Sequence, residues 1–177
     1  SSGSVITVKE TRSGGTEYGT SNSFNVQKAN QSITITGHAP ASVAYGGTFT
    51  VSATASSGLG VAVTSGGSCS GSGTGSALIT MTSSTGSCTV YYNQAGDSNY
   101  NAAPQLTETT SAQKAGTTTG LGTSGSPSAY GQSVTFTATV TSGGGTPTGT
   151  VDFRDGGSCS GGTDLGSRTL SGGIATL

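Results

Sequence analysis

The chain has 177 residues, including 30 Ser, 32 Thr and 32 Gly, and only 7% of its residues carry a charge. The net charge of −1 excludes electrostatic attraction to nucleic acid or anionic membranes, and no apolar run reaches the ~18 residues of a membrane span. Disordered chains have high net charge and many Pro, Glu and Lys. This composition instead favours an extracellular all-β protein built from small side chains.

Alternation of apolar and polar residues predicts strands along the whole chain. It is clearest in TFTVSATAS (residues 48–56) and SVTFTATVT (133–141), where apolar residues share one face and mainly Thr and Ser share the other. In chain order, strands are expected at 5–8, 24–26, 33–36, 48–56, 61–63, 77–81, 88–92, 133–141, 150–153, 167–170 and 174–177. Short strands separated by Gly- and Ser-rich joints predict a β-sandwich.

Three cysteines leave one without an obvious partner. Cys69 and Cys88 are 19 residues apart and are flanked by expected strands, so we expect a disulfide that removes about 3 kcal/mol of unfolded-state entropy. Two free buried thiols are the alternative. Cys159 is either free or paired outside the chain.

An internal repeat of about 85 to 90 residues divides the chain. AYGGTFTVSATAS begins at Ala44 and AYGQSVTFTATVT at Ala129, 85 residues later. QKA and GGSCSG also occur twice, at offsets of 86 and 90 residues. The repeat predicts one complete domain at residues 30–115, the first part of another at 116–177, and the last strands of a preceding one at 1–29.

The repeated segments resemble bacterial Ig-like repeat domains. The resemblance is carried by AYGQSVTFTATVT, GGGTPTGTVDFRDGG and LGSRTLSGGIATL, and by GSCTVYYNQAGDSNYNAAP in the complete unit. It implies tandem immunoglobulin-like β-sandwiches, one complete domain flanked by two partial ones, in an extracellular stalk, adhesin spacer or surface scaffold. It supplies no catalytic residues.

The sequence contains only weak matches to cofactor-binding and catalytic motifs. GLGTSG at residues 120–125 matches a dinucleotide fingerprint, but Pro127 and an expected strand follow where a helix is needed. GSCSG occurs twice, yet His38 is the only histidine and no helix is expected, so a turn or a disulfide is favoured over a nucleophile elbow. No metal, cofactor or catalytic site is therefore predicted, and the chain is expected not to be an enzyme.

Several other residues can be interpreted either as part of a functional site or as ordinary structural residues. Carboxylates near Arg154 are a calcium candidate but are more simply solvated turn residues. The two QKA lysines are candidates for an isopeptide bond but sit in polar linkers, and three tyrosines form a candidate sugar platform or cover a sandwich edge. The sequence also contains one formal glycosylation sequon. The residues concerned are Asp152, Asp155, Asp164, Lys28, Lys114, Tyr91, Tyr92, Tyr100 and Asn30.

The two partial segments together have the length of one repeat. Placed end to start they read SGGIATL–SSGSVITV, a plausible hairpin. We therefore expect head-to-tail assembly with copies of the chain or adjacent Ig-like repeats, either within one covalent array or by strand addition between subunits. An adhesin or carbohydrate-binding accessory module of a large secreted protein is the alternative. The expected junction residues are Val5, Ile6, Thr7, Val8, Phe24, Val26, Ile174 and Leu177.

Overall fold

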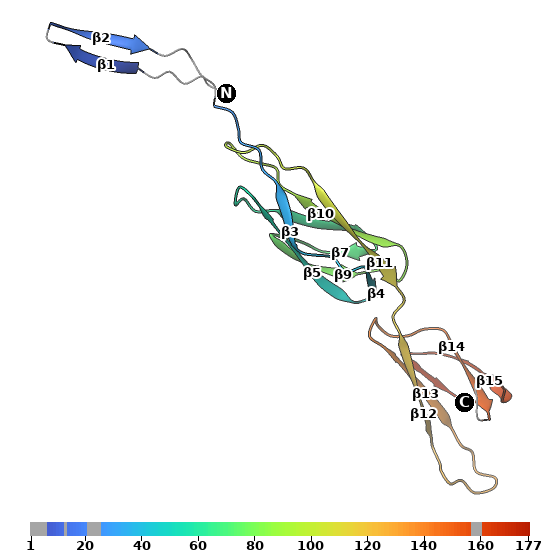
Figure 1. Ribbon diagram of the computed structural model, residues 1–177. Coiled ribbons are helices and arrows are strands. Elements are labelled where there is room, and N and C mark those ends of the chain that lie inside the picture. The colour runs from blue at the N-terminus through green and yellow to red at the C-terminus, as the bar shows by residue number, and fades with distance from the viewer. Residues whose placement is uncertain (1–6, 13, 21–25, 157–160) are drawn as a thin grey trace.

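The computed structural model describes residues 7–12, 14–20, 26–156 and 161–177. Within these ranges the chain consists of strands and loops, with no helix and hence no helix that could cross a membrane (Figure 1). The strands form three groups in sequence order: a hairpin, a central sandwich (β3–β11) and a C-terminal group (β12–β16). The all-β class is confirmed, and the predicted domain limits stay a prediction.

The N-terminal hairpin pairs β1 (Thr7–Arg12) with β2 (Gly15–Thr20) in antiparallel register, from Thr7 opposite Thr20 to Arg12 opposite Gly15. The sequence predicts β1 two residues earlier, at residues 5–8, and treats the second segment as a polar connection. Threonines recur through both strands, and Gly14 turns the chain with a φ of 126°. Threonine favours extended strands, which is consistent with pairing along both segments.

The central sandwich has two facing sheets. One sheet has the order β3 (Ile33–Gly37), β5 (Thr48–Ala55), β9 (Ser76–Met81) and β7 (Cys69–Ser70). The other has the order β4 (Ser42–Ala44), β11 (Leu106–Gln113), β10 (Ser87–Asn93), β6 (Ala62–Gly67) and β8 (Ser72–Thr74). Neighbouring strands are antiparallel except β4 and β11.

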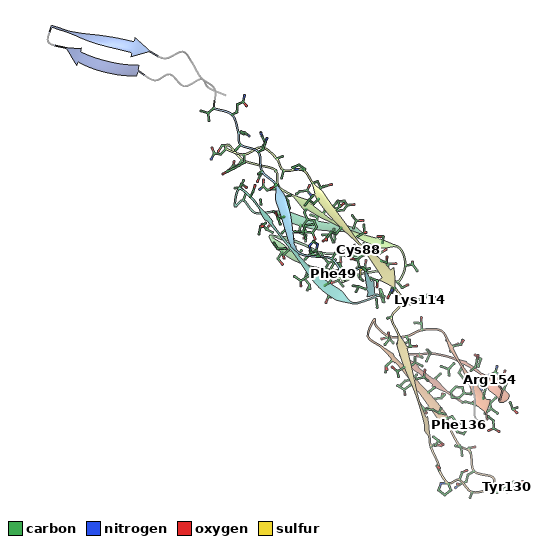
Figure 2. All side chains as sticks on the ribbon, viewed as in Figure 1. Phe49, Cys88, Lys114, Tyr130, Phe136 and Arg154 are labelled. Carbon is green, nitrogen blue, oxygen red and sulfur yellow. A yellow bond between two sulfur atoms is a disulfide. The ribbon has the colours of Figure 1, made fainter. Side chains whose placement is uncertain are left out.

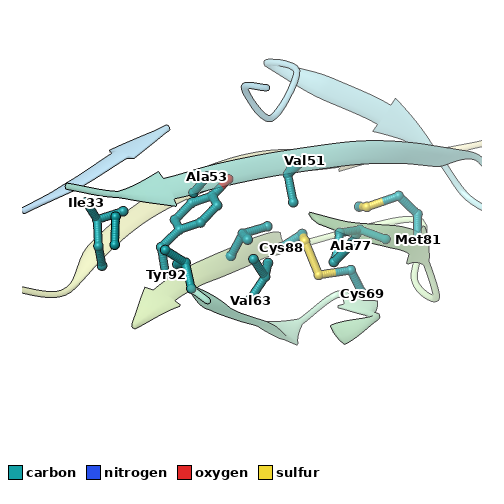
Figure 3. Packing of buried hydrophobic residues seen from close by; sticks show 13 residues of the cluster. Ile33, Val51, Ala53, Val63, Cys69, Ala77, Met81, Cys88 and Tyr92 are labelled. Atoms are coloured by element: carbon teal, nitrogen blue, oxygen red, sulfur yellow. A yellow bond between two sulfur atoms is a disulfide. The ribbon is translucent and has the colours of Figure 1, made fainter. Parts of the chain in front are cut away.

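Alternate residues of facing strands fill the core between the two sheets (Figure 3). Tyr92 and Val90 from β10 are fully buried and pack in one cluster with residues of β5 and β9. Cys69 and Cys88 are joined by a disulfide with their Cα atoms 5.2 Å apart, which matches the bridge expected from the sequence. Because Cys69 lies in β7 and Cys88 in β10, the bridge ties one sheet to the other.

The C-terminal group contains a smaller pair of sheets. One has the order β12 (Thr117–Thr123), β13 (Phe136–Ser142) and β16 (Ile174–Thr176), and the other pairs β14 (Thr150–Asp155) with β15 (Thr163–Thr169). Ala138, Phe153 and Ala175 form its small buried core. Leu177 extends the edge, since its N–H donates to Phe136 O at 3.0 Å and its carbonyl accepts from Phe136 N–H at 2.9 Å.

Removing the disulfide tests how far it holds the two sheets together. We expect Cys69→Ala with Cys88→Ala to lower the free energy of unfolding by about 3 kcal/mol, because the open chain regains the entropy of the closed loop. Thermal unfolding followed by circular dichroism measures the change. As a control, a reducing agent should destabilise the parent chain and leave the double variant unaffected. Equal stability of parent and variant would contradict a stabilising role.

Candidate assembly surface

An open groove of about 580 Å³ runs between the two sheets of the C-terminal group. Its apolar lining comes from all four of its contributing strands, β12, β13, β14 and β15. The apolar members are Leu121, Phe136, Ala138, Val151, Phe153 and Leu165. Leu121 is 68% exposed, and Phe136 and Val151 are only half-buried. The groove therefore combines half-exposed apolar side chains with two that are buried, Ala138 and Phe153.

The central sandwich shows how additional strands in the second sheet cover such a groove. There, β10 pairs with β6 on one side and β11 on the other, and it buries Cys88, Val90 and Tyr92 completely. In the C-terminal group, β14 pairs only with β15 among the described residues. The edge of β14 away from β15 therefore has backbone groups with no strand partner in the described chain, beside apolar side chains that remain half-exposed.

Charged groups lie at one end of the groove. Asp152, Arg154 and Asp155 belong to β14 and are exposed, and Figure 2 shows Arg154 on the outer part of the C-terminal group. Asp164 caps a local turn by accepting a hydrogen bond from Gly166 N–H at 2.9 Å. No three metal-ligating side chains converge in the part of the chain that the structure describes.

The expected junction residues fall into three places. Thr7 and Val8 lie in β1, and Val26 is exposed just before the central sandwich. Ile174 pairs with Thr139 across β16 and β13, and Leu177 closes the same edge. Val5, Ile6 and Phe24 lie outside the described residues. The structure does not bring the N-terminal and C-terminal members together within one chain, so their role as a junction stays a prediction.

The weaker motifs divide between buried and exposed positions. Tyr92 is wholly buried, so a sugar platform built from all three candidate tyrosines is wrong. Cys69 is in a disulfide and cannot act as a thiol nucleophile, while Cys159 lies outside the described residues. Lys28 and Lys114 are exposed, whereas an isopeptide bond requires a buried lysine.

One polar cluster escaped the sequence analysis. The Glu108 carboxylate accepts hydrogen bonds from Tyr92 OH at 2.8 Å and from Ala39 N–H at 3.0 Å, and it pairs with His38 Nδ1 at 2.6 Å. Glu108 is 70 residues from His38, so no local pattern indicates the contact. The cluster fastens the segment after β3 to β11 and to the core tyrosine of β10, which is a structural rather than a catalytic arrangement.

Burial and hydrogen bonds shift the pKa values of this cluster in opposite directions. Partial burial raises the pKa of Glu108, but the hydrogen bonds from His38, Ala39 and Tyr92 outweigh it and hold the pKa below its ordinary value. Burial raises the pKa of the Tyr92 hydroxyl well above its usual range, and the hydrogen bond to Glu108 and its negative charge add to the effect. Tyr92 therefore remains a donor and Glu108 an acceptor at neutral pH.

Acid should weaken the central sandwich through Glu108. A carboxylate with a depressed pKa stabilises the fold while it is ionised, and that stability is lost as the pH falls below the ordinary value of 4.5 through the folded-state pKa. We expect Glu108→Gln to lower the free energy of unfolding at pH 7 by about 1–2 kcal/mol and to flatten its acid dependence. Urea unfolding at a series of pH values measures both, with the exposed-carboxylate variant Asp152→Asn as control. An unchanged acid profile in Glu108→Gln would show that other groups cause the acid dependence.

Comparison with known proteins identifies the C-terminal part of the chain. The family model of the bacterial Ig-like domain (group 3) matches residues 121–177, which include the end of β12 and all of β13, β14, β15 and β16. No curated protein and no solved structure matches the chain. Domains of this family are typically extracellular or surface modules and are generally not enzymes. The resemblance to bacterial Ig-like repeat domains is therefore confirmed over residues 121–177.

Proposed function

We propose that this chain is a non-enzymatic structural repeat of an extracellular bacterial fibre, stalk or filament. Its units associate head to tail, with the C-terminal group of one unit completed by strands from the N-terminal part of the next. The observation that carries the proposal is the apolar groove beside the unpartnered edge of β14. The central sandwich supports it, because the corresponding space there is filled by β10 and β11.

The occupant that fits the groove is a pair of strands with alternating apolar residues. A strand laid along β14 would satisfy its open backbone groups, and every second side chain would enter the groove. Leu121, Phe136 and Leu165 would then become covered in the way that the residues of β5 and β9 are in the central sandwich. The N-terminal part of a second unit supplies such a segment in VITV, at residues 5–8.

The low charge of the chain is consistent with a structural role. Exposed faces carry Thr, Ser and Gly, and the apolar groove combines concavity with the exposed large side chains of Leu121 and Leu165. The buried position of Tyr92 removes part of the support for the carbohydrate-binding alternative. Assembly through backbone pairing and apolar burial also tolerates wide changes in salt, because neither depends on long-range charge.

A charge placed in the groove should prevent completion. We expect Leu121→Lys to weaken association of the C-terminal group with its completing strands by about 10–100-fold, since the loss of about 1.5–3 kcal/mol of apolar burial has that effect. Because Leu121 is already exposed, the substitution should leave the isolated chain folded. Leu78→Lys is the matched control, since Leu78 is 60% exposed on β9, away from the groove.

The measurement is amide hydrogen exchange in two settings: the single chain at increasing concentration, and two full copies fused from Leu177 to Ser1. Completion should protect the amides of Thr150–Asp155 in either setting, with Leu78→Lys behaving like the parent and Leu121→Lys losing protection. If these amides exchange equally fast in the dilute single chain and in the fusion, the completion mechanism is wrong.

A further inference from the structure

Two turns with nearly the same sequence and with the same hydrogen bond precede β5 in the central sandwich and β13 in the C-terminal group. AYGG occupies residues 44–47 before β5, and AYGQ occupies 129–132 before β13. In each, the alanine carbonyl accepts from the N–H three residues later, at 2.9 Å in the first turn and 3.1 Å in the second. Gly46 and Gly131 have φ values of 77° and 85°, so both turns need glycine at the same place. We refer to them as the Tyr45 turn and the Tyr130 turn.

The Tyr45 turn packs against the following strand group. A Cβ atom on Gly46 would lie 2.9 Å from Gly144 Cα, so the two backbones are in direct contact. A Cβ atom on Gly144 would lie 2.6 Å from Tyr45 O and 3.1 Å from Tyr45 Cδ1. Gly144 belongs to the loop that connects β13 to β14. The Tyr45 turn of the central sandwich and the loop between β13 and β14 of the C-terminal group are thus in close contact. We call this contact the first joint.

The Tyr130 turn has the same hydrogen bond but makes no such contact with another described residue. Tyr130 is fully exposed, whereas Tyr45 is 42% exposed, and a Cβ atom on Gly131 would meet no described atom within 4 Å. Figure 2 shows Tyr130 at the end of the C-terminal group that lies away from the central sandwich. A fully exposed tyrosine ring at a turn is an available apolar contact surface.

The complementary loop is also open, on the central sandwich. Residues 56–61, the loop between β5 and β6, correspond to the loop between β13 and β14 that contains Gly144. A Cβ atom on Gly58 would meet nothing within 4 Å, and Leu59 is only half-buried. This loop therefore combines exposed backbone with an apolar side chain, which suits a tyrosine ring.

We propose that the Tyr130 turn docks onto the loop at residues 56–61 of a second copy of this chain and repeats there the joint that the Tyr45 turn makes with Gly144. The inference rests on the head-to-tail order of the proposed function, which places these two surfaces next to each other. Strand completion would connect one copy of the chain to the next. The contact of the Tyr130 turn would fix the orientation of the second copy's central sandwich relative to the C-terminal group of the first copy.

The spacing within the chain fits a repeated joint. The linker QKA ends 16 residues before Tyr45, at Ala29, and 15 residues before Tyr130, at Ala115. A Cβ atom on Gly144 would also lie 2.6 Å from Ala115 Cβ, so the linker takes part in the first joint. A second copy brings the same linker, Gln27 to Ala29, directly before its own central sandwich. The parts of the first joint thus recur in the same order at the second.

Disulfide trapping in the fusion of two full copies tests the joint. In a Cys159→Ser background, Ser128→Cys is placed in the first copy and Ser56→Cys in the second, because both serines are exposed and their replacement keeps Tyr130 and Leu59 in place. The control pair replaces Ser56→Cys with Ser83→Cys, which lies in the loop between β9 and β10 at the opposite end of the central sandwich.

We expect the Ser128→Cys and Ser56→Cys pair to oxidise at least about tenfold faster than the control pair, because docking raises the effective concentration of the two thiols. Equal rates for the two pairs would overturn the joint, whatever the exchange protection of Thr150–Asp155. If the amides of Thr150–Asp155 are protected but the two cysteine pairs oxidise at equal rates, strand completion is supported and only the Tyr130 contact is wrong. If the amides are unprotected and the two rates are equal, both proposals are wrong.

Discussion

The structure depends on one constraint: each apolar sheet face must be covered by a second sheet. Only 30% of the residues are hydrophobic, and many of them are small, so each core is thin and one missing strand exposes much of it. In the central sandwich β10 meets this need, because it contributes Val90, Tyr92 and one half of the disulfide to the core. In the C-terminal group no described strand takes that position, and the same requirement leaves an apolar groove.

Hydrogen bonds of Glu108 and Thr110 stabilise strands of the central sandwich in addition to its small apolar core. Glu108 reaches from β11 to Tyr92 of β10 and to His38 and Ala39 after β3, so one carboxylate connects three segments. Thr110, also fully buried in β11, donates to Pro40 O at 2.8 Å. Both contacts hold the short connection between β3 and β4 against β11. Hydrogen bonds at buried sites such as these stabilise the register of a strand as well as its presence.

The sequence predicts the strands whose apolar residues alternate regularly. Residues 48–56 and 88–92 have that pattern and form β5 and β10, and the 19-residue spacing of the cysteines indicates the disulfide. β12 was missed because its sequence, TTTGLGT, has one large apolar residue and is exposed along its whole length. The Glu108 cluster was missed because it joins residues 70 positions apart, and the groove because it is defined by the arrangement of strands rather than by any motif.

In an extended array of small sandwiches, the connection between neighbouring sandwiches and their relative orientation depend on different contacts. In the proposed assembly, strand completion would connect one copy of the chain to the next, but a single linker would still allow neighbouring sandwiches to bend relative to each other. A second contact beside the linker removes that freedom, and the glycines at Gly46 and Gly144 let two backbones approach closely enough to make it. The Tyr45 turn that makes this contact connects β4 to β5. The strands that form the central sandwich therefore also fix the position of the contact. A repeat of this design needs few charges and few large residues to form a directed array, which is consistent with a chain in which Ser, Thr and Gly make up more than half of the residues.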